Sequence, residues 1–128
     1  MEAAVANGWI PPLRSNAKRV LVVDDDREIR ELLVELLSIE GYEVSAAGDG
    51  QLALAEARAR RPDVILLDLM MPIMNGWEFR DAQLKDLELA GVPVVVVSAF
   101  DDTLDVAAVL RKPFQIDEVL ATVQRLTT

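Results

Sequence analysis

The sequence predicts an α/β fold in which five parallel strands form a doubly wound sheet with helices on both faces. Short runs of aliphatic residues at 20–23, 64–67 and 94–97 are typical of strands that are buried on both sides. Segments with apolar residues three and four positions apart, typical of amphipathic helices, follow some of these runs. Alternating buried strands and helices favour a parallel sheet, because each connection then places a helix on one face of the sheet.

The regular pattern begins at Arg19. Residues 20–23 predict the first strand, and the helix after them is predicted to end before Gly41, a residue suited to the position after a helix. The apolar face of that helix consists of Ile29, Leu32, Leu33, Leu36 and Leu37. Residues 42–47 predict a second strand, and the Ala-rich segment 51–60 predicts a helix that Pro62 stops.

The second half of the chain contains three further predicted strands, at 64–67, 94–97 and 108–110, and a helix from about Trp77 to Leu87. The inward stripe of a last helix is predicted to comprise Ile116, Val119, Leu120 and Val123. Nine residues, 99–107, separate Ser98 from the fifth strand, whereas a parallel crossover usually needs a dozen or more. We therefore expect the fourth helix of the fold to be short or absent.

Composition restricts the range of functions. The 128 residues suit one domain, and we expect residues 1–18 to be a flexible N-terminal extension and residues 19–128 to form the domain. A formal net charge of −9 argues against direct binding of nucleic acid. The chain has no cysteine and no histidine, which excludes disulfides, thiolate metal sites and histidine-based catalysis. No apolar stretch is long enough to span a membrane, so we expect a cytoplasmic protein that contacts no membrane.

Polar residues gather at the carboxyl ends of the predicted strands, which is where ligands bind in a doubly wound sheet. The residues at these ends are Asp24, Asp25 and Asp26 after the first strand, Asp68 after the third, Ser98 after the fourth and Lys112 after the fifth. Clustered carboxylates repel one another, and a hard cation such as Mg²⁺ relieves that repulsion. A carboxylate is also a nucleophile for phosphoryl transfer, and lysine and serine side chains can bind phosphoryl oxygens. Asp26 is expected only to cap the following helix.

Across about residues 19–126 the sequence resembles the receiver domain of two-component response regulators. The matching segments are VLVVDDD at 20–26, LLDLMMP at 66–72, NGWEF at 75–79, VVVVSA at 94–99 and LRKPF at 110–114. The resemblance implies a flavodoxin-like strand order of 2-1-3-4-5. It also implies the following roles: Asp68 as phospho-acceptor, Asp25 as direct Mg²⁺ ligand, Asp24 as a second acid acting through metal-bound water, the main-chain carbonyl of Met70 as a further ligand, Ser98 as the hydroxyl residue and Lys112 as the lysine, with a cis bond to Pro113.

The resemblance implies a signalling protein rather than a conventional enzyme. Such a domain catalyses its own phosphorylation, with Mg²⁺ or Mn²⁺, and its own slow dephosphorylation. The donor would be a histidine kinase or a histidine phosphotransfer protein, since this chain has no histidine. Phosphorylation would then alter binding to a downstream protein target that the sequence does not identify. Because the last predicted helix ends near the C-terminus, we expect a stand-alone receiver; a domain excised from a longer protein is the alternative.

Three features set this sequence apart within the family: the crossover, the residue at position 109 and the residues around the acceptor. The short crossover alters the face through which the family commonly signals, and Val109 stands where many receivers carry a switching aromatic residue. Phosphorylation is therefore expected to be read out differently here. Met70 and Phe100 are bulky apolar residues that flank the acceptor, and they predict a long-lived phosphoaspartate because they hinder an attacking water.

Two alternatives remain open. A receiver-like interaction module that never carries phosphate is compatible with the short crossover. A phosphohydrolase of the haloacid dehalogenase type would use Asp24 as its nucleophile, and the Asp-x-Asp at 24–26 precedes Ser98 and Lys112 in a compatible order. Against the hydrolase, the chain has no obvious acidic motif on a further strand and no room for a cap.

Overall fold

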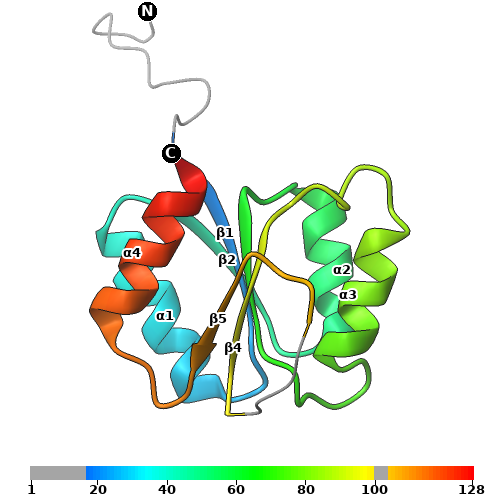
Figure 1. Ribbon diagram of the computed structural model, residues 1–128, viewed down its shortest axis with the longest axis horizontal. Coiled ribbons are helices and arrows are strands. Elements are labelled where there is room, and N and C mark those ends of the chain that lie inside the picture. Colours follow the sequence, from blue (N-terminus) through cyan, green and yellow to red (C-terminus); the bar gives the residue numbers. More distant parts are fainter. Residues whose placement is uncertain (1–16, 100–103) are drawn as a thin grey trace, which may run out of the picture.

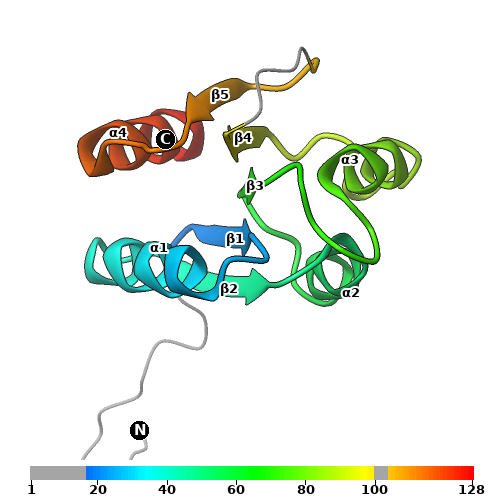
Figure 2. The same cartoon turned by 90° about the horizontal axis from the view of Figure 1, so that it is seen from below.

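The computed structural model describes residues 17–99 and 104–128, which form a five-stranded parallel sheet in the order β2-β1-β3-β4-β5. Helices α1 and α4 cover one face of the sheet, and α2 and α3 cover the other (Figures 1 and 2). The elements are β1 (Arg19–Val23), α1 (Arg27–Ile39), β2 (Glu43–Ala47), α2 (Gly50–Ala59), β3 (Val64–Leu67), α3 (Gly76–Leu84), β4 (Val94–Ser98), β5 (Ala108–Arg111) and α4 (Ile116–Thr127). The predicted fold class and strand order are confirmed. No helix in the described ranges is long and apolar enough to cross a membrane.

The aliphatic strands supply two hydrophobic cores, one on each face of the sheet. In β1, Leu21 and Val23 pack toward α2 and α3, whereas Val20 and Val22 pack toward α1 and α4. Strands β3 and β4 alternate in the same way, because successive side chains of a strand point to opposite faces. This two-sided burial is the physical reason that these strands contain almost no polar residue before their carboxyl ends.

Side-chain caps fix where the helices begin. Asp26 caps α1, as predicted, and its carboxylate accepts hydrogen bonds from the backbone N–H groups of Glu28 and Ile29. Gly41 follows α1 with a φ of 96°, which confirms its predicted position after the helix. Asp49 caps α2 in the same manner as Asp26, a role that the sequence analysis did not assign.

Helix α3 ends at Leu84, three residues before the predicted end at Leu87. The backbone N–H groups of Lys85 and Asp86 bond to carbonyls three residues earlier, so the last turn tightens and stops. The Asp86 carboxylate then accepts a hydrogen bond from the N–H of Glu88, which starts a new turn.

In α4, Val119 and Val123 are buried as predicted, but Ile116 is 42% exposed, so its predicted place in the inward stripe is wrong.

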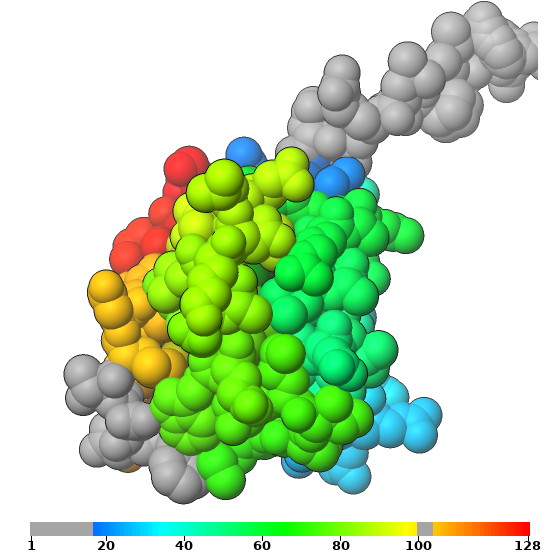
Figure 3. Space-filling view, turned by 90° about the vertical axis from the view of Figure 1, so that its right-hand side faces the viewer, coloured from blue at the N-terminus to red at the C-terminus, as the bar shows by residue number. Residues whose placement is uncertain are grey.

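The crossover from β4 to β5 contains no helix among its described residues, 99 and 104–107. Leu104 and Val106 instead pack against the core beneath α2 and α3, and Arg80 of α3 donates a hydrogen bond of 2.7 Å to the carbonyl of Asp105. Figure 3 shows this segment and β5, in orange, beside α3, in yellow-green. Val109 of β5 points to the same face and is 44% exposed. Leu104, Val106 and the side chain of Arg80 therefore cover part of the surface that a crossover helix would otherwise cover.

Gln83 ties α3 to the loop that leads into β4. Its side chain is fully buried, and its amide nitrogen donates to the carbonyls of Leu89 at 2.9 Å and Val92 at 3.0 Å. Its amide oxygen accepts a hydrogen bond of 2.8 Å from Arg80. Burial lowers the pKa of the Arg80 guanidinium, whereas the nearby Asp105 carboxylate favours its charged form. Gln83 and Arg80 thus connect α3 to the segments at both ends of β4.

Candidate functional site

The carboxyl ends of β1 and β3 bring three aspartates together. Val23 pairs with Leu67 in the sheet, so the residues that follow, Asp24 and Asp68, emerge side by side. One carboxylate oxygen from each of Asp24, Asp25 and Asp68 lies within 4.8 Å of the others. Asp24 is 2% exposed and Asp68 is 6% exposed, whereas Asp25 lies at the surface. The predicted acidic residues therefore form one cluster that is open to solvent on the side of Asp25.

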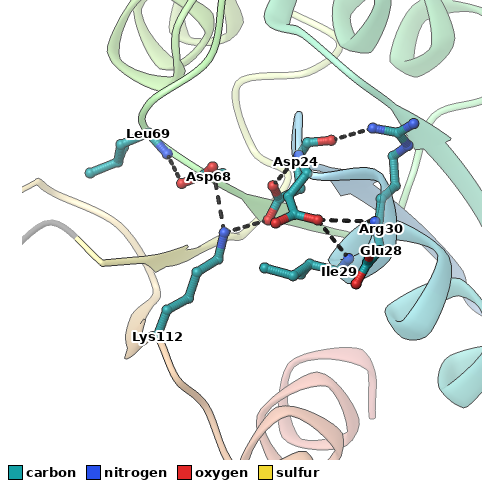
Figure 4. Close-up of polar contacts among 8 residues, drawn as sticks. Asp24, Glu28, Ile29, Arg30, Asp68, Leu69 and Lys112 are labelled. Carbon is teal, nitrogen blue, oxygen red and sulfur yellow. Dashed lines mark hydrogen bonds and ion pairs between the residues drawn. The ribbon is translucent and has the colours of Figure 1, made fainter.

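Lys112 reaches this cluster from the end of β5, as Figure 4 shows. Its ammonium nitrogen lies 2.6 Å from Oδ2 of Asp24 and 3.5 Å from Oδ2 of Asp68. The Lys112–Pro113 peptide bond is cis, as the resemblance implied, and the backbone N–H of Lys112 bonds to the carbonyl of Ser98 at 3.0 Å. The lysine therefore stands between the two buried carboxylates and pairs more closely with Asp24.

Burial raises the pKa of Asp68, and the charge of Asp24 raises it further. Lys112, the backbone N–H of Leu69 and the side chain of Ser98 oppose that rise, and the Leu69 bond measures 2.8 Å. Burial acts to lower the pKa of Lys112, but its hydrogen bond to Asp24 and the charges of both aspartates outweigh burial, so the pKa rises. The site therefore favours a charged lysine and disfavours a charged Asp68.

The donor set fits a hard divalent cation. Unit charges 4.8 Å apart repel by roughly 3 kcal/mol at an effective dielectric constant of about 20, and one lysine faces three carboxylates. Mg²⁺ prefers carboxylate and carbonyl oxygens in an incomplete protein shell that leaves room for water and phosphate. Asp24, Asp25 and Asp68 offer such oxygens at suitable mutual spacing, and their repulsion gives the site a physical reason to take up a cation.

The loop between β3 and α3 closes tightly around the acceptor. The N–H of Gly76 bonds to the carbonyl of Leu69 at 2.8 Å, and a Cβ atom at Gly76 would lie 2.7 Å from Cα of Leu69 and still closer to the carbonyl oxygen of Asp68. Ile73 has a φ of 69°, and the N–H of Met74 bonds to the carbonyl two residues earlier, which forms a strained three-residue turn. Backbone strain of this kind often accompanies functional loops.

Met70 and Phe100 are the other residues that the sequence placed at the acceptor. Met70 lies in this loop with its side chain half exposed, and the metal-binding role of its carbonyl remains a prediction. Phe100, the other residue expected to shield the acceptor, lies outside the described residues.

Sequence reasoning missed Arg30, whose side chain bonds to the main chain of Asp24. Its only sequence signal is a basic residue four positions after the helix cap, which is too common to be diagnostic.

Comparisons with known proteins agree with this arrangement. The family model described as response regulator receiver domain matches residues 20–124. The chain is 41% identical over 115 residues to the DNA-binding response regulator MtrA of Mycobacterium tuberculosis (strain ATCC 25618 / H37Rv), covering 84% of this chain and 49% of that relative. It is also 41% identical over 118 residues to the response regulator MprA of Mycolicibacterium vanbaalenii, with coverages of 84% and 49%. The chain thus spans about half the length of these curated relatives.

Solved structures show the same fold. The chemotaxis protein CheY4 of Vibrio cholerae superimposes with a TM-score of 0.80 at 34% identity, covering 86% of this chain and 98% of that structure. The receiver domain of the Francisella response regulator 1452 gives a TM-score of 0.76 at 32% identity, with coverages of 86% and 96%. Because MtrA is named a DNA-binding regulator, the relatives give no support to the expectation that nucleic acid is excluded. The chain belongs to the response regulator receiver domain family.

Proposed function

We propose that the chain is a phospho-accepting signalling receiver, in which Asp68 takes a phosphoryl group from a phosphohistidine of a partner protein with the help of Mg²⁺. The observation that carries this proposal is the position of Lys112 between Asp24 and Asp68, at the same strand ends as Ser98 and Asp25. A buried carboxylate that is crowded by a second carboxylate, and balanced by one lysine, is suited to accept a charged group when a cation is also bound.

In the proposed reaction, an ionised oxygen of Asp68 attacks the phosphorus of the donor's phosphohistidine. The new O–P bond replaces the N–P bond, whose electron pair leaves with the imidazole, and the imidazole takes up a proton from solvent. Lys112 shifts from Asp24 toward a phosphoryl oxygen, and the Ser98 hydroxyl donates a hydrogen bond to another. The product is an acyl phosphate on Asp68.

The cation, Mg²⁺ or Mn²⁺ in its place, supplies positive charge to the carboxylates and to the phosphoryl oxygens. Asp25 and Asp68 would hold it directly with the main-chain carbonyl of Met70, and Asp24 would act through water. Since the chain itself has no histidine, the donor is a histidine kinase or a histidine phosphotransfer protein.

The output side of the proposal follows from the crossover. We infer that a downstream protein reads the surface formed by α3, residues 104–107 of the crossover and β5, where Val109 stands in place of an aromatic switch. Slow loss of the phosphoryl group and a cytoplasmic location are part of the same proposal, as is the division into an extension at 1–18 and a domain at 19–128. Whether a longer protein containing this receiver binds DNA, as the name of MtrA states for that relative, is a separate question.

The proposal is tested by incubating the protein with acetyl phosphate and Mg²⁺ and measuring its intact mass. We expect a gain of one phosphoryl group that disappears with a chelator and in Asp68→Asn. Asp26→Asn is the matched control, since it removes a carboxylate of the same run that caps α1 and asparagine caps equally well. Absence of any mass gain would identify a silent interaction module. Phosphate release that survives in Asp68→Asn but not in Asp24→Asn would identify a hydrolase.

A further inference from the structure

Arg30 contacts the acidic cluster from behind, through the main chain rather than through a carboxylate. It lies in the second turn of α1, and its Nη1 donates a hydrogen bond of 2.7 Å to the carbonyl oxygen of Asp24. Figure 4 shows this guanidinium on the opposite side of Asp24 from Lys112. The space it occupies borders Gly48, where a Cβ atom would lie 3.3 Å from Nη1 of Arg30.

This bond completes the fixation of Asp24. Its backbone N–H bonds to the carbonyl of Ala47 at 3.1 Å, its Oδ1 accepts from the N–H of Asp26 at 2.9 Å, and its Oδ2 accepts from Lys112. With Arg30 on the carbonyl, each backbone and side-chain polar group of Asp24 has a partner. Two of those partners, Lys112 and Arg30, are cations, but only Arg30 holds the backbone.

The bond also bears on Asp25. The carbonyl of Asp24 belongs to the peptide group that leads into Asp25, so fixing the plane of that peptide restricts where the exposed Asp25 carboxylate points. In the proposed reaction Lys112 leaves Asp24 for a phosphoryl oxygen. Arg30 is then the cationic partner that keeps the strand end in place.

We propose that Arg30 is a positioning residue for the metal site: it orients the Asp24–Asp25 peptide so that the Asp25 carboxylate holds the cation directly and the Asp24 carboxylate acts on it through water. This inference rests on the proposed function, because it requires that the site binds Mg²⁺. A positioning role and a purely electrostatic role predict opposite changes in Mg²⁺ affinity when Arg30 is removed. Removing a positive charge near carboxylates strengthens cation binding by Coulomb's law, whereas releasing the peptide group weakens it.

The test is a calorimetric titration of Mg²⁺ into the full chain at fixed ionic strength, for the wild type, Arg30→Gln and Arg30→Lys. Arg27→Gln is the matched control, because Arg27 lies on the same helix, pairs with Glu31 at the surface and loses the same charge. We expect Arg30→Gln to bind Mg²⁺ about ten-fold more weakly, the lower end of what loss of a ligand-orienting contact costs. Arg27→Gln is expected to bind as the wild type does, or slightly more tightly.

The unfolding free energy without metal, measured on the same variants, separates positioning from folding. An affinity of Arg30→Gln equal to or tighter than that of the wild type would overturn the inference. If Arg30→Gln does not fold, Arg30→Lys decides. Lysine keeps the charge, but its nitrogen ends one bond short of the Nη1 that donates to the carbonyl of Asp24, so we expect weakened binding, and wild-type affinity would overturn the inference. A wild type that binds no Mg²⁺ would instead refute the proposed function.

Discussion

The substitution Gln83→Leu isolates the buried hydrogen bonds that hold α3 to the loop before β4. Leucine has a similar volume, so the change adds little cavity. The carbonyl of Val92 loses its donor, whereas the carbonyl of Leu89 keeps a second donor, the backbone N–H of Val92 at 3.0 Å, and both residues are nearly fully buried. The unsatisfied carbonyl of Val92 costs about 1–3 kcal/mol, and Arg80 loses one of its acceptors. Leucine recovers part of this cost through burial of apolar surface, so we expect a net destabilisation of about 2 kcal/mol.

The assay is urea denaturation of the two proteins at pH 7, followed by fluorescence. We expect a lower midpoint with an unchanged slope, since the surface exposed on unfolding stays nearly the same. Gln51→Leu, an identical chemical change at an exposed position of α2, should alter stability by no more than about 0.5 kcal/mol. A loss below about 1 kcal/mol for Gln83→Leu would show that the carbonyl of Val92 finds another partner and would refute this reasoning.

Three further predictions concern other parts of the chain. The hydrogen bond from Arg58 holds the pKa of Asp86 below its usual range. The stability that the ionised Asp86 contributes is therefore present above the unfolded-state pKa of about 3.9 and is lost as the pH falls through the folded-state pKa. The difference in unfolding free energy between the wild type and Asp86→Asn, measured in urea at pH 7 and pH 3, should be smaller at pH 3. Gly76→Ala places a Cβ atom against the backbone of Asp68, so we expect a loss of about 2 kcal/mol and slower phosphorylation by acetyl phosphate, and an unchanged rate would contradict the tight fit. Ile73→Gly relieves a positive φ at a side chain that is 74% exposed, so the unfolding free energy measured in urea should stay level or rise by up to about 1 kcal/mol, whereas a clear fall would mean that the turn carries no strain.

The sequence predicted those features that depend on local pattern. Buried strands require aliphatic residues at successive positions, so the point at which the polar residues Asp24 and Asp68 appear marks a strand end. In a parallel sheet these ends share one edge, and the meeting of both residues with Lys112 follows from topology. The short crossover could be predicted from residue count alone.

Other features depend on long side chains that cross between elements, which no periodicity encodes. The early end of α3 accompanies an inward-facing Gln83 and a new turn at Asp86, neither of which the apolar stripe indicated. Arg30 and Arg80 both donate to main-chain carbonyls of other segments, and such contacts depend on tertiary distance rather than on residue type. Ile116 satisfied the helical pattern, yet it is the first residue of α4 and remains 42% exposed.

The most direct measurement for the central claim identifies the chemical bond and its position together. The protein is phosphorylated in the presence of Mg²⁺ with phosphoramidate, whose P–N bond resembles that of phosphohistidine. It is then reduced with borohydride, which converts an acyl phosphate of aspartate to homoserine. Peptide mass mapping should place homoserine at position 68 alone. Homoserine at position 24, or no conversion at any position in a sample with a confirmed phosphoryl mass gain, would contradict the assignment of Asp68 as the acceptor.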